Sequence, residues 1–509
     1  MTNVPKNCGE SDDAKIDKPK IHNAVGEKRY ININKHNVIA LLVLSLSLII
    51  AVRIPWLKFL NQNHANSSSH KKYWVYGTNV ESGYLNNVFT VLGKVGYKNT
   101  STSSDDWDLL WAHNYPFFDL YTKLKNLKSH QRVNKFPGSG FITNKVDLAT
   151  SGLKYIPPAF RLPKDKEKFL NYAKTNTNKQ FVEKNNNHRH VRIKNISEID
   201  LNNKDTFVQE FIDKPLLVSG YKFDIGVYVI FTSVDPLRVY VYHGDYLLRF
   251  CPEFYYPFDP LNIDKYVVGD DYLPTWEVPS LKYYYKTLGF GMAESLNAYL
   301  RSKGKDPGKI WSQIEESIRI IGLAKEQNII NSLKRFSSTR NFFELMRFDF
   351  VVNEDLEVFL MEANMSPNLS SAHFPPNRLL FEQVIFNVLG LVGVSDLISI
   401  RSRSVEEMQV ADKNIVVFPN ECNSSMCRNG CMAPLCQLCR PCILDESKHT
   451  LQEAYREHIN KGSCKRIYPP SMKVEDIDIH EDLEMYSPEN QFQHRWFQGK
   501  CLMDPSWCV

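Results

Sequence analysis

The stretch that decides the fold is Phe343–Ser370, FELMRFDFVVNEDLEVFLMEANMSPNLS. Two mainly apolar runs, Arg347–Val352 and Glu357–Met361, flank a turn at Asn353–Asp355. Asn and Asp suit such a turn because they tolerate left-handed backbone conformations and form local hydrogen bonds. The pattern therefore predicts a β-hairpin whose strands are buried.

Three polar side chains interrupt this apolar hairpin. Asp349 lies in the middle of the first strand, and Glu362 and Asn364 end the second. Carboxylates are rarely buried without a partner, because their desolvation is costly. We expect Asp349 and Glu362 to face each other across the hairpin, with Asn364 on the same side. Such a cluster of oxygen ligands suits Mg²⁺ and the phosphates that it carries. The alternative is a strand with its polar face in solvent.

Composition places the chain among ordinary globular proteins. It has 509 residues, of which 43% are hydrophobic and 23% are charged, so we expect two or three domains. The formal net charge of +5 is too small to indicate a nucleic-acid partner, and it is compatible with an acidic protein substrate.

The N-terminal part predicts a membrane anchor. Residues 1–36 are polar and aperiodic, which predicts a disordered tail. Residues 37–60 contain an uncharged apolar run that predicts one transmembrane helix, and 61–72 form a polar linker. A buried helix and a cleaved signal peptide are the alternatives. Basic residues are more frequent before the run, which favours a type II single-pass protein with a luminal body. The opposite orientation, with the body of the chain on the cytosolic face, is the alternative.

Residues 73–395 alternate between strand and helix patterns, which predicts an α+β or α/β fold. Trp74–Tyr76, Tyr84–Gly93 and Trp107–Trp111 predict a strand–helix–strand unit. Further helices are expected at Phe141–Ala149, 166–174, Leu281–Leu300, Gly308–Leu323 and Asn377–Leu391.

Two strands carry residues that suit a phosphate site. Lys184 lies where a strand passes into a polar loop, a common place to hold phosphates, although lysine at strand ends is also commonplace. The strand around Gly220–Val229 has Lys222, Asp224 and Gly226 on one face. A surface ion pair between Lys222 and Asp224 is the alternative.

The C-terminal region, residues 396–509, is rich in cysteine. The spacing Cys436–Cys439–Cys442, with His449 and His458 nearby, is typical of zinc ligands. Disulfides in an oxidising compartment are the alternative, and the predicted membrane anchor favours them. The cysteines concerned are Cys422, Cys427, Cys431, Cys436, Cys439, Cys442, Cys464, Cys501 and Cys508. Their odd number leaves one over in the disulfide case.

Several motifs in order resemble a known family. They are DDWDLLWAHNYPF (105–117), QRVNKFPGSGFITNKVDLA (131–149), VQEFIDKPLLVSGYKFDIGVYVIFTSVDPLRVYVY (208–242) and the hairpin above. Across about residues 73–392 the chain resembles the tubulin–tyrosine-ligase-like proteins. The resemblance implies an ATP-grasp-like region with three subdomains, 73–150, 151–215 and 216–395. It also implies ligation of amino acids to proteins, most often of glutamate to tubulin.

The family chemistry assigns expected roles to individual residues. ATP phosphorylates an acceptor carboxylate, and the amine of free glutamate then attacks the acyl phosphate, so Mg²⁺ and cations must be prepositioned. The resemblance implies that Asp349, Glu362 and Asn364 hold Mg²⁺. It places Lys184 and Lys222 on ATP, Asp224 on the ribose, and Arg249 on the transferred phosphate. The strand Gln209, Glu210, Phe211 and Ile212 would lie against adenine.

Two features depart from the family pattern. The family usually has arginine where Gly226 stands, and that arginine would help to bind the terminal phosphate. The expected phosphate loop, Asn187–Val191, contains no glycine, and His188, Arg189 or His190 would then compensate for the missing arginine. Three functions follow: a tubulin–glutamate ligase, the same chemistry on secretory-pathway proteins, or a non-catalytic membrane-tethered binding protein.

Overall fold

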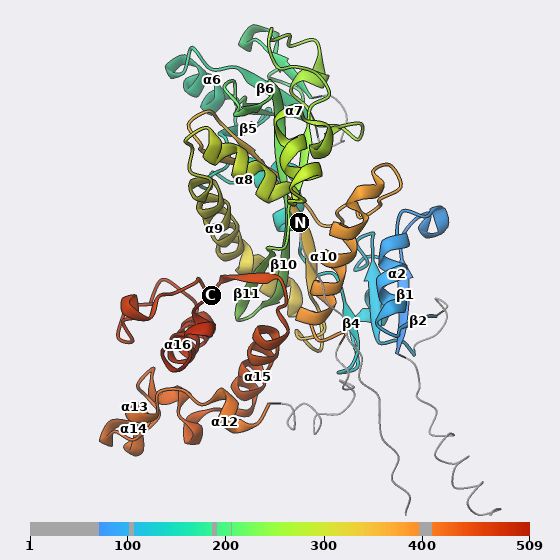
Figure 1. Ribbon diagram of the computed structural model, residues 1–509. Coiled ribbons are helices and arrows are strands. Elements are labelled where there is room, and N and C mark those ends of the chain that lie inside the picture. Colours follow the sequence, from blue (N-terminus) through green and yellow to red (C-terminus); the bar gives the residue numbers. More distant parts are fainter. Residues whose placement is uncertain (1–70, 101–105, 186–190, 205, 396–409) are drawn as a thin grey trace, which may run out of the picture. The chain divides into compact units, whose positions relative to one another are not determined.

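A computed structural model describes residues 71–100, 106–185, 191–204, 206–395 and 410–509 (Figure 1). The predicted tail 1–36, the predicted anchor 37–60 and most of the linker lie outside these ranges. None of the helices in the described ranges combines the length and the apolar character needed to cross a bilayer. The described residues form three β-sheets with helices packed on them, so the expected mixed α/β architecture is confirmed and is consistent with an ATP-grasp-like region.

The first sheet is parallel and lies within the predicted N-terminal subdomain. Its strands run in the order β2-β1-β3-β4, and helix α2 connects β1 to β2. The strand–helix–strand prediction is therefore confirmed, with tryptophans 74, 107 and 111 buried in its core. The bounds are β1 Lys72–Tyr76, α2 Asn86–Lys94, β2 Lys98–Asn99, β3 Leu109–Ala112, α3 Tyr121–Leu124 and β4 Arg132–Val133.

The second sheet is antiparallel and lies within the predicted central subdomain. Its order is β5-β8-β6-β7, and helix α6 covers it by packing Phe169 and Ala173 into a small apolar core with Phe181. The bounds are β5 Ala159–Arg161, α6 Lys166–Thr175, β6 Phe181–Asn185, β7 Arg192–Lys194 and β8 Thr206–Glu210.

The third and largest sheet is organised around the 14-residue strand β10. β14 pairs along one side of β10, β11 and β12 pair along the other, and β15 pairs with β14. Asp349 and Glu362 are directly opposed in this hairpin, as predicted. The bounds are β9 Leu217–Val218, β10 Tyr221–Val234, β11 Leu237–Tyr242, β12 Leu247–Phe250, β13 Leu273–Pro274, β14 Glu344–Val352 and β15 Val358–Asn364.

Two of the expected helices are interrupted where a side chain caps the backbone. The prediction for Phe141–Ala149 is split into α4 (Gly140–Thr143) and α5 (Lys145–Ala149), because the Asn144 side chain accepts hydrogen bonds from the first backbone amides of α5. The prediction for Leu281–Leu300 was wrong as a single helix. It consists of α7 (Pro279–Lys282), a π-helical turn (Tyr283–Thr287) and α8 (Met292–Ser302).

The break before α8 has a local cause. Gly289 has a φ of +70°, which a helix does not allow. The carboxylate of Asp245 then accepts hydrogen bonds from the amides of Met292 and Ala293 at 2.9 and 2.7 Å, and so caps α8.

The other two long helices were predicted correctly in place. Helix α9 (Gly308–Leu333) buries Ile310, Ile314, Ile318 and Ile321, and it continues ten residues past the predicted end at Leu323. Helix α10 (Arg378–Leu391) carries the amphipathic pattern expected there.

The C-terminal region contributes to the largest sheet. Strand β16 (Cys464–Tyr468) pairs antiparallel with β11. All described residues fall within one compact unit, although the predicted boundary near residue 395 stays a prediction. The remaining helices are α12 Asp412–Ile415, α13 Pro419–Cys422, α14 Ser425–Asn429, α15 Asp445–Asn460 and α16 Pro488–Met503.

Cysteines of this region are joined in disulfides. The pairs are Cys422–Cys439, Cys427–Cys436, Cys431–Cys442 and Cys501–Cys508. The cysteine left over is Cys464, which is buried in β16. Of the two histidines considered as zinc ligands, His458 stacks on Trp507 with ring centroids 3.7 Å apart, and His449 contacts Gln452. The described residues contain no group of three or more His, Cys, Asp or Glu placed to hold a metal ion.

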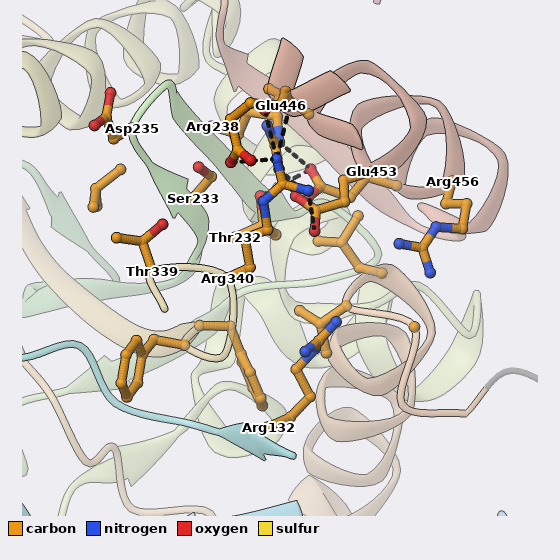
Figure 2. A pocket seen from close by; sticks show the side chains of 18 residues that line it. Arg132, Thr232, Ser233, Asp235, Arg238, Thr339, Arg340, Glu446, Glu453 and Arg456 are labelled. Carbon is orange, nitrogen blue, oxygen red and sulfur yellow. Dashed lines mark hydrogen bonds and ion pairs between the residues drawn. The ribbon is translucent and has the colours of Figure 1, made fainter. Parts of the chain in front are cut away.

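A buried charge network joins helix α15 to the largest sheet. The Arg238 side chain, 1% exposed, donates to both carboxylate oxygens of Glu457 at 2.9 Å and to Gln493 at 3.0 Å. Figure 2 shows Arg238 and Arg340 pointing toward Glu453 at this junction, where they line a cavity of about 60 Å³. Arg238 and Arg340 are paired with glutamates of α15, so we interpret this junction as structural.

Candidate active site

A cavity of about 800 Å³ lies between the second and third sheets. Its wall is made by β6 and β8 on one side and by β10, β12, β14 and β15 on the other. The predicted site residues that line it are Lys184, Glu210, Phe211, Ile212, Lys222, Asp224, Arg249, Asp349, Glu362 and Asn364. Gln209 is buried behind the wall instead, where its amide nitrogen donates to Pro157 O. The roles assigned to these residues stay predictions.

Asp349 is the most heavily bonded carboxylate of the cavity. Arg347 donates to both of its oxygens, with Nε to Oδ1 at 2.6 Å and Nη2 to Oδ2 at 2.8 Å. Arg249 Nη2 donates to Oδ2 at 3.2 Å and Asn364 Nδ2 at 3.1 Å. Alternation along β14 and β15 turns Arg347, Asp349 and Asn364 to the same side of the sheet.

Glu362 is held by a lysine from the first part of the chain. Lys145 Nζ, on α5, lies 2.7 Å from Glu362 Oε2, and Asn364 Nδ2 donates to Oε1 at 3.0 Å. Burial by itself would raise the pKa of Glu362, but Lys145 and Asn364 outweigh burial and hold this pKa at about 2. Glu362 is therefore an anion throughout the physiological pH range.

Asp224 is paired with its neighbour across the sheet, Arg249. Arg249 Nε and Nη2 donate to the two Asp224 oxygens at 3.0 and 2.7 Å. Burial raises the pKa of Asp224 to about 6, and Arg249 offsets only part of that rise. Both oxygens are thus engaged by arginine, an arrangement that the predicted ribose contact did not anticipate.

Two of the lysines that line the cavity, Lys184 and Lys222, have neutral hydrogen-bond partners. Lys184 Nζ donates to Gln209 Oε1 at 2.7 Å, and Lys222 Nζ donates to the Tyr266 carbonyl at 2.9 Å and lies over the Phe211 ring. Burial lowers the pKa of Lys184 to about 8 and also lowers that of Lys222. Buried cations without a carboxylate partner favour the binding of an anion.

The predicted adenine strand ends in an apolar wall. Glu210 is turned into contacts with Lys179 and Tyr172, at 2.7 and 2.5 Å. Phe211 packs against Tyr266, with ring centroids 5.9 Å apart. An apolar wall next to buried cations matches a ligand with a flat apolar part and a charged part.

The donor set fits Mg²⁺ and ATP. Asn364 Nδ2 donates to both Asp349 and Glu362 and so joins the two carboxylates, whose oxygens are ligands of the kind that Mg²⁺ takes. A half-turn of the Asn364 amide would direct its Oδ1 to the same place. The lysines and arginines around them suit phosphate oxygens.

Sequence reasoning missed two residues of this cavity. Lys145 comes from a helix of the first third of the chain, and no local pattern connects it to Glu362. Arg347 did leave a signal, because it stands two residues before Asp349 on a strand and so shares its face. The loop with His188, Arg189 and His190 lies outside the described residues.

Comparison with known proteins identifies the family of this chain. The family model described as "Tubulin-tyrosine ligase family" matches residues 122–400. A Caenorhabditis elegans protein named "Probable tubulin polyglutamylase ttll-15" is 41% identical over 441 residues, which cover 84% of this chain and 84% of that protein. The chain belongs to the tubulin–tyrosine ligase family.

More distant family members carry related names. The human tubulin polyglutamylase TTLL7 is 26% identical over 331 residues, covering 59% of this chain and 36% of that protein. The human tubulin monoglutamylase TTLL4 is 26% identical over 432 residues, covering 80% of this chain and 32% of that protein. The chain thus spans about a third of the length of these two human members of the tubulin–tyrosine ligase family.

Proposed function

We propose that this chain is an ATP- and Mg²⁺-dependent ligase that adds glutamate to side-chain carboxylates of a protein, with tubulin as the substrate. The observation that carries the proposal is the cavity in which Asp349, Glu362 and Asn364 meet buried lysines and arginines. Membership of the tubulin–tyrosine ligase family, and the glutamylase names of its relatives, support the reaction class.

Bound ATP with Mg²⁺ supplies the phosphoryl group that converts the acceptor carboxylate into an acyl phosphate for attack by free glutamate. The residues of the chain bind and orient. Lys184 and Lys222 place positive charge against the nucleotide phosphates. Arg249 remains a cation because the attraction of Asp224 outweighs the effect of burial and raises its pKa, so it can stabilise charge on the transferred phosphate.

Glu362 stays ionised for metal binding. Glu362 keeps its charge because Lys145 lies beside it, and Asn364 fixes its orientation. The same ion pair ties α5 to the end of β15, so the predicted metal ligands are positioned by two separate parts of the chain.

Secretory-pathway proteins are the second candidate substrates, and the disulfides favour them. Disulfides persist in oxidising compartments, which agrees with the proposed type II membrane topology through residues 37–60 and a luminal body. The glycosylation sequons at Asn99 and Asn423 are exposed. The alternative location is the cytosolic face near microtubules, where tubulin tails lie.

Purified full-length protein tests the reaction directly. Incubation with tubulin, ATP, Mg²⁺ and radiolabelled glutamate should add label to tubulin, with mass spectrometry locating glutamate on side-chain carboxylates. An Asp349→Asn variant should add none. Absence of label on tubulin and on secreted acidic proteins would leave the third function, a non-catalytic binding protein. Protease protection of vesicles with a C-terminal tag, together with glycosylation at Asn99, separates the two substrate pools.

A further inference from the structure

The side chain of Arg347 fills the space that a side chain at position 226 would need. Gly226, on β10, is paired with Asp349 across the β10–β14 ladder. A β-carbon at Gly226 would lie 3.0 Å from Arg347 Cδ, 3.3 Å from Arg347 Nε and 3.3 Å from Asp349 Oδ1. These distances are too short for a side chain at 226 unless Arg347 moves. The volume that such a side chain would take is filled by the arginine from the neighbouring strand.

Arg347 is placed as a functional group of the cavity. Its side chain is 8% exposed, it lines the cavity, and its Nε and Nη2 both donate to Asp349. The guanidinium is a permanent cation, because arginine does not lose its proton at accessible pH. A planar guanidinium that meets a carboxylate with two parallel bonds can meet a phosphate in the same way.

The charges of the cavity leave a place for an anion. Asp224 pairs with Arg249, and Glu362 pairs with Lys145. Asp349 is shared between Arg249 and Arg347. A cation that took oxygens of Asp349 would release Arg347 from at least one of its two bonds. The released guanidinium would then need an anionic partner inside a largely buried site.

We propose that Arg347 binds the terminal phosphate of the bound nucleotide, from the place that a side chain at residue 226 would otherwise occupy. The proposal rests on the proposed ATP-dependent function. Arg347 on β14 thus supplies the guanidinium that the family arginine at position 226 on β10 would have provided. Arg347 thereby distinguishes a nucleoside triphosphate from a diphosphate.

Binding of ATP and ADP to the full-length protein, measured by calorimetry with Mg²⁺ present, tests this role. Loss of one charge-assisted phosphate contact should weaken ATP binding of Arg347→Ala about ten- to a hundredfold, with ADP affinity changed less than threefold, roughly the scatter of such effects. Arg301→Ala, which removes an exposed arginine on α8, is the matched control and should bind both nucleotides as the wild type does.

The exchange of the two residues supplies the second arm. Gly226→Arg alone should lose ATP affinity, because the new side chain meets Arg347. Gly226→Arg combined with Arg347→Gly should bind ATP within about threefold of the wild-type affinity, because a single guanidinium again occupies this space. If Arg347→Ala does not fold, as judged by circular dichroism, the double variant and Arg347→Gln carry the test.

Three results with the variants would overturn the inference. They are equal loss of ATP and ADP affinity in Arg347→Ala, a gain of Mg²⁺-dependent ATP binding in that variant, and no recovery in the double variant. The gain would mean that Arg347 stands in the place of the metal and blocks it. The inference also fails if the wild type binds neither nucleotide. The proposed ligase function fails separately: it fails if the wild type binds ATP more tightly than ADP through Arg347 but transfers no glutamate.

Discussion

Affinity for ATP should depend on the charge of Lys184, one of the two lysines proposed to face the nucleotide phosphates. Its Nζ is buried, and its hydrogen-bond partner is the neutral Gln209 oxygen at 2.7 Å. Burial lowers the pKa of Lys184 from 10.5 to about 8. The informative substitution is Lys184→Arg, because a guanidinium keeps its proton at every accessible pH.

The expected magnitude follows from this pKa. A phosphate binds the ammonium form more tightly than the neutral amine, so bound ATP raises the pKa of Lys184. ATP affinity is therefore constant below pH about 8 and falls above it. At the pKa half of the lysine is protonated, and one unit above it about one part in eleven, so the affinity should fall about five- to sixfold from pH 8 to pH 9. The fall ends once the pH exceeds the raised pKa of the complex.

Calorimetric titration with ATP and Mg²⁺ over a range of about pH 7.5 to 9.5 measures this dependence, above the range in which the terminal phosphate of ATP itself titrates. Lys184→Arg should show a flat profile over the same range. A wild-type profile without a fall, or an equal fall in Lys184→Arg, would show that Lys184 does not contact the phosphates and would refute the reasoning.

Three further outcomes are expected. Arg238→Ala leaves Glu457 buried without its cation and should lower the unfolding free energy, measured by urea denaturation, by about 3–5 kcal/mol. The double variant Arg238→Met with Glu457→Leu should lose much less, and equal losses in the two variants would contradict a role for the buried ion pair. Glu362→Gln should weaken Mg²⁺-dependent ATP binding about tenfold or more in a Mg²⁺ titration, and unchanged Mg²⁺ dependence would remove Glu362 from the metal site. Gly138→Ala should lower the unfolding free energy by about 1–3 kcal/mol, since φ is +88° and its β-carbon would lie 2.6 Å from Ser332 Oγ; an unchanged thermal transition would argue against this turn.

The central hairpin was predictable because its signals are local. The turn residues at Asn353 and Asp355 fix where the chain reverses, and alternation with a period of two then opposes Asp349 and Glu362. Lys184, Lys222 and Asp224 could be added because each stands at a recognisable place on a strand. The cavity that brings them together depends on the packing of two sheets, which no local pattern encodes.

What the sequence did not reveal depends on contacts between distant segments. Lys145 pairs with Glu362 only because α5 packs beside β15. Arg347 looked like the polar start of a strand, and its role becomes visible only where Gly226 on the neighbouring strand leaves room. The break before α8 depends on Asp245, which belongs to a loop nearly fifty residues earlier.

Strand β16 has a practical consequence for anyone who expresses this protein in pieces. Cutting the chain at residue 395, the predicted end of the ligase region, would remove the strand that covers β11, whose residues 237–242 are all buried. The fragment would present a bare apolar edge, a known template for aggregation. The same dependence orders biosynthesis, because the sheet cannot be completed until β16 has left the ribosome.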